Sequence, residues 1–252
     1  MSEPLRPGTT AVVTGASRGI GLAIAVALAH EGADVVGIAS SEASADAARE
    51  PVERLGRRYR GLGANLADRD DVHRLVADIH SAAGVPDILV HAAGINRRAP
   101  IVDHGDELWD EVLAVNLTAP FVLSRELGRG MVARGSGKIV FLASMLSFQG
   151  GLTVPGYAAS KGGVAQLVKA FSNEWAARGV NVNAVAPGYV DTEMNSALVA
   201  DATRFEQISA RIPAGRWARP SDIAGAVVFL ASPASDYVHG TVLPVDGGWL
   251  GR

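Results

Sequence analysis

The sequence contains no cysteine among its 252 residues. This absence excludes disulfide bonds, catalysis by a thiolate and zinc sites with cysteine ligands. The six histidines are scattered and lack the spacing of a metal site, so we expect no bound metal. A chain of this length needs no disulfide or metal to stabilise its core, because folding buries most of the surface that the unfolded chain exposes.

Long apolar segments and a strong excess of one charge are also missing. No apolar run approaches the ~18 residues of a membrane-spanning helix, and the polar residues 1–7 lack the apolar core of a secretory signal. The net charge of −3 argues against a nucleic-acid surface and against an anionic-membrane binder. We therefore expect a cytoplasmic protein that acts on a small molecule, with no nucleic-acid or membrane partner.

Short apolar runs alternate with helical patterns along the chain, which predicts an α/β fold. We expect residues 1–252 to form one domain with a Rossmann-like, doubly wound parallel sheet of about seven strands and helices on both faces. Strands are predicted over 10–14, 34–38, 59–63, 87–92, 137–143, 180–186 and 241–245. Helices are predicted over 20–30, 44–55, 69–83, 107–133, 157–178 and 221–231.

A glycine-rich turn follows the first predicted strand. Gly15, Gly19 and Gly21 give the spacing GxxxGxG, and a helical pattern begins at once after it. Such a turn lets the backbone approach a pyrophosphate, whose charge is favoured by the helix N-terminus. The spacing by itself is equally compatible with an ordinary turn between strand and helix.

Tyr157 and Lys161 lie four residues apart. On a helix they share one face, so the phenol and the ammonium can address the same point. A phenol titrates near pH ~10, and a neighbouring ammonium lowers that pKa. A decrease of ~3 units requires roughly 4 kcal/mol, so a second positive charge, such as an oxidised nicotinamide ring, would assist Lys161. Such a pair also arises by chance on many helices.

Ser144 follows the apolar run 138–143, at the carboxyl end of a predicted strand. Its hydroxyl can hydrogen-bond a reacting oxygen there and stabilise developing charge. An isolated serine at a strand end is more often a turn residue, so this reading also depends on the surrounding motifs.

Taken in order, these motifs resemble the short-chain dehydrogenase/reductase family. The resemblance runs from Thr10 to Gly248 and is carried by GxxxGxG, Ala92-Ala93-Gly94, Asn116, Ser144, YxxxK and Pro187-Gly188. It implies an enzyme that interconverts a secondary alcohol and a ketone by hydride transfer. The implied catalytic residues are Asn116, Ser144, Tyr157 and Lys161.

Each of these residues has a role that the resemblance implies. Tyr157 exchanges a proton with the substrate oxygen, and Lys161 lowers its pKa and holds the nicotinamide ribose. Asn116 kinks its helix and positions a water linked to the lysine, and Pro120 nearby supports a local distortion. His91 stands where the family usually has asparagine, and we expect it to be structural and not a general base.

The resemblance also implies a nicotinamide cofactor. Its binding residues are expected to be Gly15, Ser17, Arg18, Gly19, Ile20, Gly21, Ser40, Asn65, Leu66, Ala92, Gly94, Tyr157, Lys161, Pro187, Gly188, Val190 and Thr192. Neither an acidic nor a basic residue stands at 39–41, where the choice between NAD and NADP is usually made. Arg18 favours NADP, whereas Glu42 could accept a ribose hydroxyl. We expect NAD, with NADP as the alternative.

Within the family, several tracts are similar to the 2-deoxy-D-gluconate 3-dehydrogenases, also named 2-dehydro-3-deoxy-D-gluconate 5-dehydrogenases. The tracts are 143–151, 173–176, 211–217 and 245–252. A sugar acid needs an arginine and several hydrogen-bonding side chains. The substrate candidates are Asn96, Arg97, Arg98, Ser144, Ser147, Gln149 and Tyr157. Residues 191–216 are expected to form a lid over the substrate.

Alternative functions remain open from the sequence. A β-ketoacyl-thioester reductase or a glucose or polyol dehydrogenase would use the same fold and the same four catalytic residues. A non-catalytic nicotinamide-binding protein would have no need for all four. For the pair Arg97 and Arg98, a solvated surface position is nearly as compatible with the sequence as a carboxylate site.

The apolar faces of the predicted helices 107–133 and 157–178 suggest assembly. In the family these helices pair across a two-fold axis, and a second interface near the C-terminus completes a homotetramer with 222 symmetry. Trp249 and Leu250 would suit that second interface or reach a neighbour's active site. The alternative is a C-terminal tail folded on its own subunit.

Overall fold

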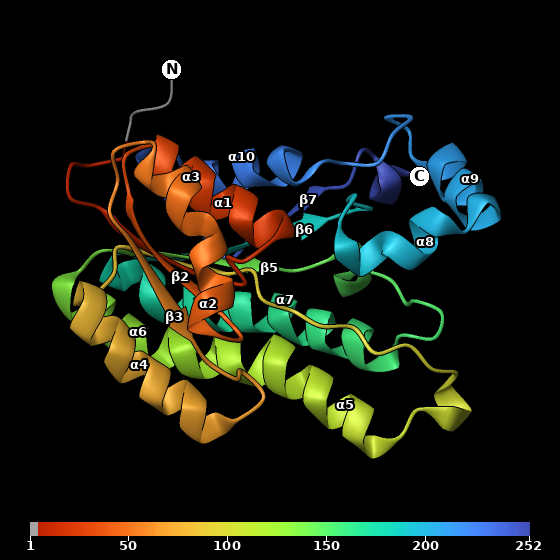
Figure 1. Ribbon diagram of the computed structural model, residues 1–252, viewed down its shortest axis with the longest axis horizontal. Coiled ribbons are helices and arrows are strands. Elements are labelled where there is room, and N and C mark those ends of the chain that lie inside the picture. Colours follow the sequence, from red (N-terminus) through yellow and green to blue (C-terminus); the bar gives the residue numbers. More distant parts are fainter. Residues whose placement is uncertain (1–4) are drawn as a thin grey trace.

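The computed structural model describes residues 5–252, which form seven parallel strands in one sheet with the order β3-β2-β1-β4-β5-β6-β7 (Figure 1). The strands are β1 (Thr10–Thr14), β2 (Asp34–Ala39), β3 (Tyr59–Gly63), β4 (Ile88–His91), β5 (Gly137–Leu142), β6 (Val180–Pro187) and β7 (Val242–Val245). Each predicted strand is confirmed, with ends that differ by one residue at most. The doubly wound α/β fold is therefore the one that the sequence predicts.

Helices cover both faces of the sheet. Side chains that alternate along a strand enter different layers. Val13 packs with α1 (Gly19–His30) and α10 (Pro220–Ala231), and Val12 packs with α4 (Arg69–Ala83), α6 (Ala119–Arg134) and α7 (Pro155–Trp175). This is why the strands are apolar at consecutive positions. The longer helices are α1 (Gly19–His30), α4 (Arg69–Ala83), α5 (Asp106–Leu113), α6 (Ala119–Arg134), α7 (Pro155–Trp175), α9 (Ala202–Arg211) and α10 (Pro220–Ala231). None of the helices described is long and apolar enough to cross a membrane.

Two predicted helices are interrupted. The prediction over 44–55 becomes α2 (Glu42–Ala45), a 3₁₀ turn and α3 (Arg49–Glu53). Pro51 has no amide hydrogen and is tolerated only in the first turn of a helix, so a new helix begins just before it. The prediction over 107–133 becomes α5 and α6, separated by a π-helical turn over Ala114–Thr118.

The glycine-rich turn between β1 and α1 has a backbone that side chains would block. Gly15 has a φ of +72°, a region that favours glycine. A Cβ on Gly21 would lie 2.1 Å from the carbonyl oxygen of Gly15. Backbone atoms therefore pack directly against each other in this turn, and no side chain fits at Gly21.

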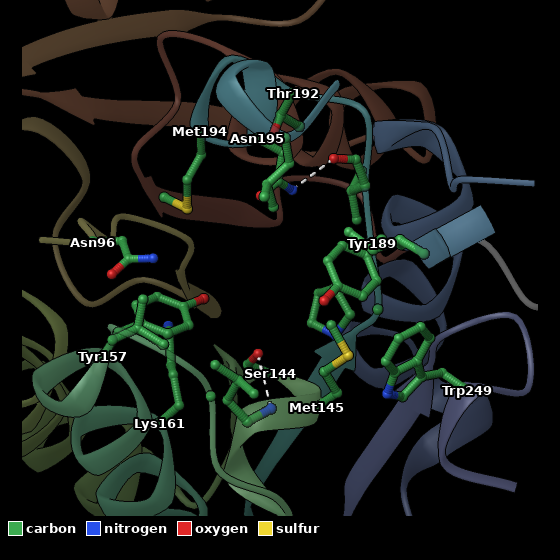
Figure 2. Close-up of a pocket in the computed structure, with 18 of the residues that line it drawn as sticks. Asn96, Ser144, Met145, Tyr157, Lys161, Tyr189, Thr192, Met194, Asn195 and Trp249 are labelled. Atoms are coloured by element: carbon green, nitrogen blue, oxygen red, sulfur yellow. Dashed lines mark hydrogen bonds between the residues drawn. The ribbon is translucent and has the colours of Figure 1, made fainter. Parts of the chain in front are cut away.

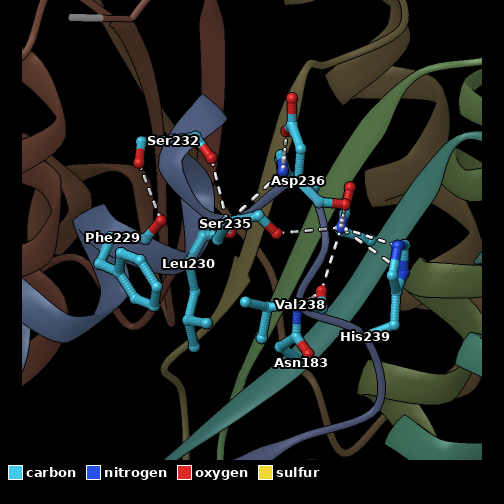
Figure 3. Close-up of polar contacts among 10 residues, drawn as sticks. Asn183, Phe229, Leu230, Ser232, Ser235, Asp236, Val238 and His239 are labelled. Atoms are coloured by element: carbon cyan, nitrogen blue, oxygen red, sulfur yellow. Dashed lines mark hydrogen bonds and ion pairs between the residues drawn. The ribbon is translucent and has the colours of Figure 1, made fainter. Parts of the chain in front are cut away.

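The N-terminal half of β6 is anchored by asparagine side chains (Figure 3). The Nδ2 atom of Asn183 donates to the carbonyl of Val238 at 2.8 Å, and that of Asn181 donates to the carbonyls of Asp236 and Val238, each at 3.0 Å. These bonds satisfy buried backbone groups of the segment that leads into β7. They fix the end of the sheet opposite to the carboxyl ends of the strands.

Candidate active site

A cavity of about 450 Å³ lies at the carboxyl ends of β4, β5 and β6. In doubly wound sheets ligands bind at this edge, beside the point where the strand order reverses. Ala92 follows β4, Ser144 follows β5 and Gly188 follows β6, and all three line the cavity. Figure 2 shows Tyr157 and Asn96 on one side of the space and Trp249 on the other.

The predicted catalytic residues Ser144, Tyr157 and Lys161 come together in this cavity. Ser144 is 7% exposed, and its hydroxyl accepts a hydrogen bond from the amide of Leu146 at 3.1 Å. The Nζ atom of Lys161 lies 5.6 Å from the centroid of the Tyr157 ring and donates to the carbonyl of Leu142 at 2.6 Å. The helix spacing thus brings phenol and ammonium to one site, as predicted.

The expected lowering of the Tyr157 pKa is wrong for the protein without a cofactor. Burial raises the pKa of this phenol above its ordinary value, although the nearby Ser144 hydroxyl and the charge of Arg98 oppose the shift. Burial also lowers the pKa of Lys161 to about 8. Desolvation outweighs the nearby charges because both groups lie in a poorly solvated space. At neutral pH Tyr157 is therefore a phenol with a proton to donate.

Asn116 lies in the π-helical turn and is 1% exposed. Its Oδ1 accepts from the amide of Ile95 at 2.8 Å, and its Nδ2 donates to the carbonyl of Ile95 at 2.9 Å and to Oγ of Ser160 at 3.1 Å. The extra residue in the turn directs the amide toward the loop after β4. The predicted distortion of this helix is confirmed, whereas the water relay stays a prediction.

His91 is structural, as the sequence led us to expect. Its Nε2 lies 2.8 Å from Oγ of Ser124 on α6, and its ring packs against Phe141 with centroids 4.6 Å apart. Burial, with a smaller effect of the Lys161 charge, lowers the pKa of this imidazole to about 3. A neutral, buried ring joins β4 to α6 here and does not face the cavity.

The predicted cofactor residues lie along one edge of the sheet. Those that line the cavity are Ile20, Ala92, Gly94, Tyr157, Lys161, Pro187, Gly188, Val190 and Thr192. Gly15 packs close to the loop after β4, since a Cβ there would lie 2.8 Å from the backbone of Ala93. Outside the cavity lie Gly15, Ser17, Arg18, Gly19, Gly21, Ser40, Asn65 and Leu66, in the turns that follow β1, β2 and β3.

The start of α1 fits a pyrophosphate. The N-cap residue Arg18 makes no side-chain capping bond, and the first turn of α1 contains no acidic residue. The first amide groups of a helix without a cap are free to bind an anion. Beside the closely packed glycine-rich turn, these amides offer backbone donors for the phosphates of a dinucleotide.

The residues after β2 and β3 are engaged locally. Ser41 caps α2 by accepting from the amide of Ser44, Glu42 forms an ion pair with Arg60 at 3.5 Å, and Oδ1 of Asn65 accepts from the amide of Ala67 at 3.1 Å. Ser40 is exposed. No charged residue therefore occupies the end of β2 itself. The nearest acidic residue, Glu42, is paired with Arg60.

Two predicted substrate residues do not face the cavity. The guanidinium of Arg97 makes two bonds of 2.7 Å to Glu111 on α5. The hydroxyl of Ser147 donates to the carbonyl of Lys161 at 2.7 Å and accepts from the amide of Ser144 at 3.3 Å. Both side chains are therefore committed to the protein. Asn96, Arg98, Ser144, Gln149 and Tyr157 do line the cavity.

The segment 191–216 forms the outer wall of the cavity, where the lid was predicted. It contains a 3₁₀ turn (Glu193–Asn195), α8 (Ser196–Ala200) and α9. The cavity-facing residues of α9 are Arg204, Gln207, Ile208 and Arg211. Their spacing of i, i+3, i+4 and i+7 marks one helix face. This spacing is present in the sequence and indicates the helix face that carries Arg204 and Arg211, two residues outside the predicted set.

The C-terminal tail folds on its own subunit. Trp249 is 5% exposed, lines the cavity and packs against Tyr189 with ring centroids 4.9 Å apart. Leu250 packs in the same small hydrophobic cluster as Trp249. Both residues thus pack on the lid of the same chain, which is the alternative that the sequence left open, and a part for them in a second interface stays a prediction.

Comparisons with known proteins give one family. A family model described as enoyl-(acyl carrier protein) reductase matches residues 15–250. The chain is 53% identical over 247 residues to a 2-dehydro-3-deoxy-D-gluconate 5-dehydrogenase of Pseudoalteromonas atlantica, covering 97% of each chain.

Solved structures agree with this result. One, provisionally named a 2-deoxy-D-gluconate 3-dehydrogenase of Agrobacterium tumefaciens and solved with bound NADP, is 48% identical with a TM-score of 0.91. Another, provisionally named an NAD(P)-dependent gluconate 5-dehydrogenase of Beutenbergia cavernae with NADP at low occupancy, is 50% identical with a TM-score of 0.94. Each comparison covers 98% of both chains.

Proposed function

The chain belongs to the short-chain dehydrogenase/reductase family, and we propose that it interconverts a hydroxyl and a ketone of a sugar acid. The charge of the cavity carries this proposal. Arg98, Lys161, Arg204 and Arg211 line it, and no aspartate or glutamate is among its lining residues within 5–252. A carboxylate is the ligand that such a site favours, since arginine binds it with two parallel hydrogen bonds. The names of the relatives agree with this substrate class.

The residues of the cavity divide the chemistry between them. Tyr157 holds a proton at its hydroxyl, gives it to the oxygen of a ketone and takes it back from an alcohol. Ser144 donates a hydrogen bond to the same oxygen and so stabilises the charge that develops there. A bound nicotinamide supplies or accepts the hydride. Lys161 keeps a positive charge near the phenol, which is needed most when Tyr157 has lost its proton.

Cofactor choice rests on the surroundings of Arg18. Its Nε lies 3.1 Å from a carboxylate oxygen of Glu193 in the lid, so this arginine is engaged by an acid before any 2′-phosphate arrives. That contact favours NAD, in line with the prediction from the sequence, whereas the names of three neighbours include NADP. We propose that both nicotinamides bind and that NAD is preferred. The test is kcat/KM measured with each.

The proposed substrate class is tested by steady-state assays of the purified protein with both nicotinamides. The panel contains 2-dehydro-3-deoxy-D-gluconate, gluconate, the neutral polyol glucitol and a β-ketoacyl thioester. We expect kcat/KM for a sugar acid to exceed that for glucitol by at least about 10-fold, because a charged hydrogen bond contributes about 1.5–3 kcal/mol. Preferential turnover of the thioester would contradict the proposal and favour the β-ketoacyl reductase alternative.

We also propose the homotetramer with 222 symmetry. Aromatic side chains are exposed on both sides of the sheet: Trp109 and Phe121 on α5 and α6, and Phe229 and Tyr237 on and after α10. Exposed apolar groups on two opposite faces suit two separate interfaces. Light scattering should give a tetramer mass, and a stable monomer at micromolar protein would contradict it. A cytoplasmic location stays a prediction.

A further inference from the structure

We propose that Arg211 binds the carboxylate of the substrate and that residues 246–252 hold this arginine in place. The inference depends on the proposed function, because it locates the charged end of a sugar acid. Arg211 lies at the end of α9, where its side chain faces the cavity. Of the three arginines that line the cavity, it is the one whose position is fixed by an aromatic ring.

The guanidinium of Arg211 lies 3.9 Å from the centroid of the Trp249 ring. An arginine stacked on an indole keeps its N–H groups free at the edge of the guanidinium plane, where they match the two oxygens of a carboxylate. Within residues 5–252, the side chain of Arg211 takes part in no other ion pair or hydrogen bond of the structure. It is held in position and still has its donors available.

Trp249 sits here for a reason other than hydrogen bonding. Its Nε1 is buried and has no partner among the described residues, which is unfavourable for a donor removed from water. The ring makes close contacts instead with Arg211 and Tyr189. We read the position of the indole as set by these contacts, and hence as a support for the arginine.

The C-terminal segment also fixes the backbone at the end of α9. The guanidinium of Arg252 donates to the carbonyls of Ala210 at 3.1 Å and Arg211 at 2.8 Å. A cation at the last carbonyls of a helix is favourable. The carboxylate of Asp246 accepts from the amides of Gly248 and Leu250, each at 2.9 Å, and so shapes the turn that carries Trp249.

The position of Trp249 and Arg211 fits a substrate whose carboxylate lies far from the hydroxyl that reacts at Tyr157. Figure 2 shows Trp249 across the cavity from Tyr157. In a substrate oxidised at carbon 5, as in the name of the P. atlantica relative, the carboxylate is at the other end of the carbon chain. Arg98 acts at the near end instead, since its charge lowers the pKa of Tyr157. A sugar acid would therefore extend from Tyr157 to Arg211.

The proposal is tested with Arg211→Gln, with Arg204→Gln as the comparison on the same face of α9 and Arg178→Gln as a control on the far side of the fold. The measurements are kcat and KM for the sugar acid and for glucitol, and the Kd of gluconate for the enzyme by calorimetry. We expect Arg211→Gln to raise KM and Kd for the acids about 10- to 100-fold. Values of kcat/KM for glucitol should change by less than about twofold.

Three results would overturn the proposal. The first is an equal loss of kcat/KM for the sugar acid and for glucitol in Arg211→Gln. The second is a larger loss of kcat/KM for the acid in Arg204→Gln than in Arg211→Gln. The third is a Kd of gluconate that Arg211→Gln leaves unchanged. The proposed function fails separately, if the wild-type protein itself does not prefer a sugar acid to glucitol, and that result removes both proposals. If the wild-type protein prefers a sugar acid to glucitol but Arg211→Gln does not reduce that preference, only the proposal for Arg211 is removed.

The support from the tail is tested with Trp249→Phe and Trp249→Ala. Phenylalanine keeps an aromatic face, so we expect KM for the acid to stay within about twofold. Loss of the ring in Trp249→Ala should raise KM for the acid about two- to fivefold, the size of an exposed cation–π contact. A fall in kcat for acid and polyol alike, with a lower Tm, would indicate a merely structural tail.

Discussion

The two walls of the cavity are built differently. On the catalytic wall, Ser144 and Lys161 are each less than 10% exposed and bonded to neighbouring backbone groups, and Asn116 is equally buried behind that wall. On the lid wall, Arg204 and Arg211 are exposed. A reacting hydroxyl requires fixed geometry, whereas a carboxylate can be recognised by long side chains that reach the cavity from an exposed helix face, as Arg211 does from its stack on Trp249. We infer that chemistry and substrate choice are assigned to different walls, and the predictions below probe this division.

The largest effect is expected for Tyr157→Phe. The substitution removes only the hydroxyl that transfers the proton, and general acid–base catalysis contributes about 10² to 10⁴ in rate. We expect kcat to fall by that factor, while the Kd of the nicotinamide from fluorescence titration stays within about twofold. Activity within a few fold of the wild type would remove Tyr157 from the mechanism.

Lys161→Met is expected to reduce both turnover and cofactor affinity. The lysine supplies the charge beside Tyr157, and in the family it also holds the nicotinamide ribose. We expect kcat to fall about 10²-fold or more and the Kd of the cofactor to rise. Fluorescence titration measures the second effect, and an unchanged Kd would leave Lys161 with the electrostatic role alone.

His91→Asn probes the support behind the catalytic wall through pH. The pKa of His91 is about 3 in the folded protein and near ~6.5 when unfolded. Below pH 6.5 only the unfolded chain takes up this proton, so stability falls as the pH falls toward 3. At pH 5 this amounts to at most about 2 kcal/mol.

The measurement for His91→Asn is the free energy of unfolding in urea at pH 7 and pH 5. We expect the variant to lose less stability than the wild type between these values. The comparison uses the change with pH, so a constant difference in packing does not matter. An identical loss in both proteins would show that His91 is not the group that titrates.

Arg97 and Arg98 are neighbours in the sequence but are expected to have different roles, Arg97 in stability and Arg98 at the active site. Loss of the Arg98 charge raises the pKa of Tyr157 further, so Arg98→Gln should slow alcohol oxidation at neutral pH. Its pH profile should move to higher pH. Arg97→Gln loses the half-exposed pair with Glu111, which is worth up to about 1 kcal/mol of stability, and should keep kcat. The same pH profile of alcohol oxidation in both variants would contradict this difference.

The smallest effect is expected for Glu193→Gln on the lid. The ion pair with Arg18 is exposed, with side-chain exposures of 74% and 69%, and such pairs contribute up to about 1 kcal/mol. Release of Arg18 should raise kcat/KM for NADP relative to NAD by at most about fivefold. Assays with both nicotinamides measure the ratio. A ratio that is unchanged or moves toward NAD would exclude competition for Arg18.

Prediction from the sequence succeeded where the signal is local. The period of apolar residues located the strands, and the asparagine and proline near position 116 indicated the distorted helix. It failed for Arg97 and Ser147, because their partners are Glu111 and the carbonyl of Lys161, each 14 residues away. It left the place of the tail open, because the contact of the tail with α9 joins segments about 40 residues apart.

The sequence by itself determined the α/β fold and the candidates for catalysis, because helix period, strand period and motif spacing are properties of neighbouring residues. The tertiary structure alone decided the pKa shifts of Tyr157 and Lys161 and the arginines that face the cavity. Both depend on burial and on contacts between distant segments. Desolvation is set by everything packed around a group, and spacing along the chain does not encode it.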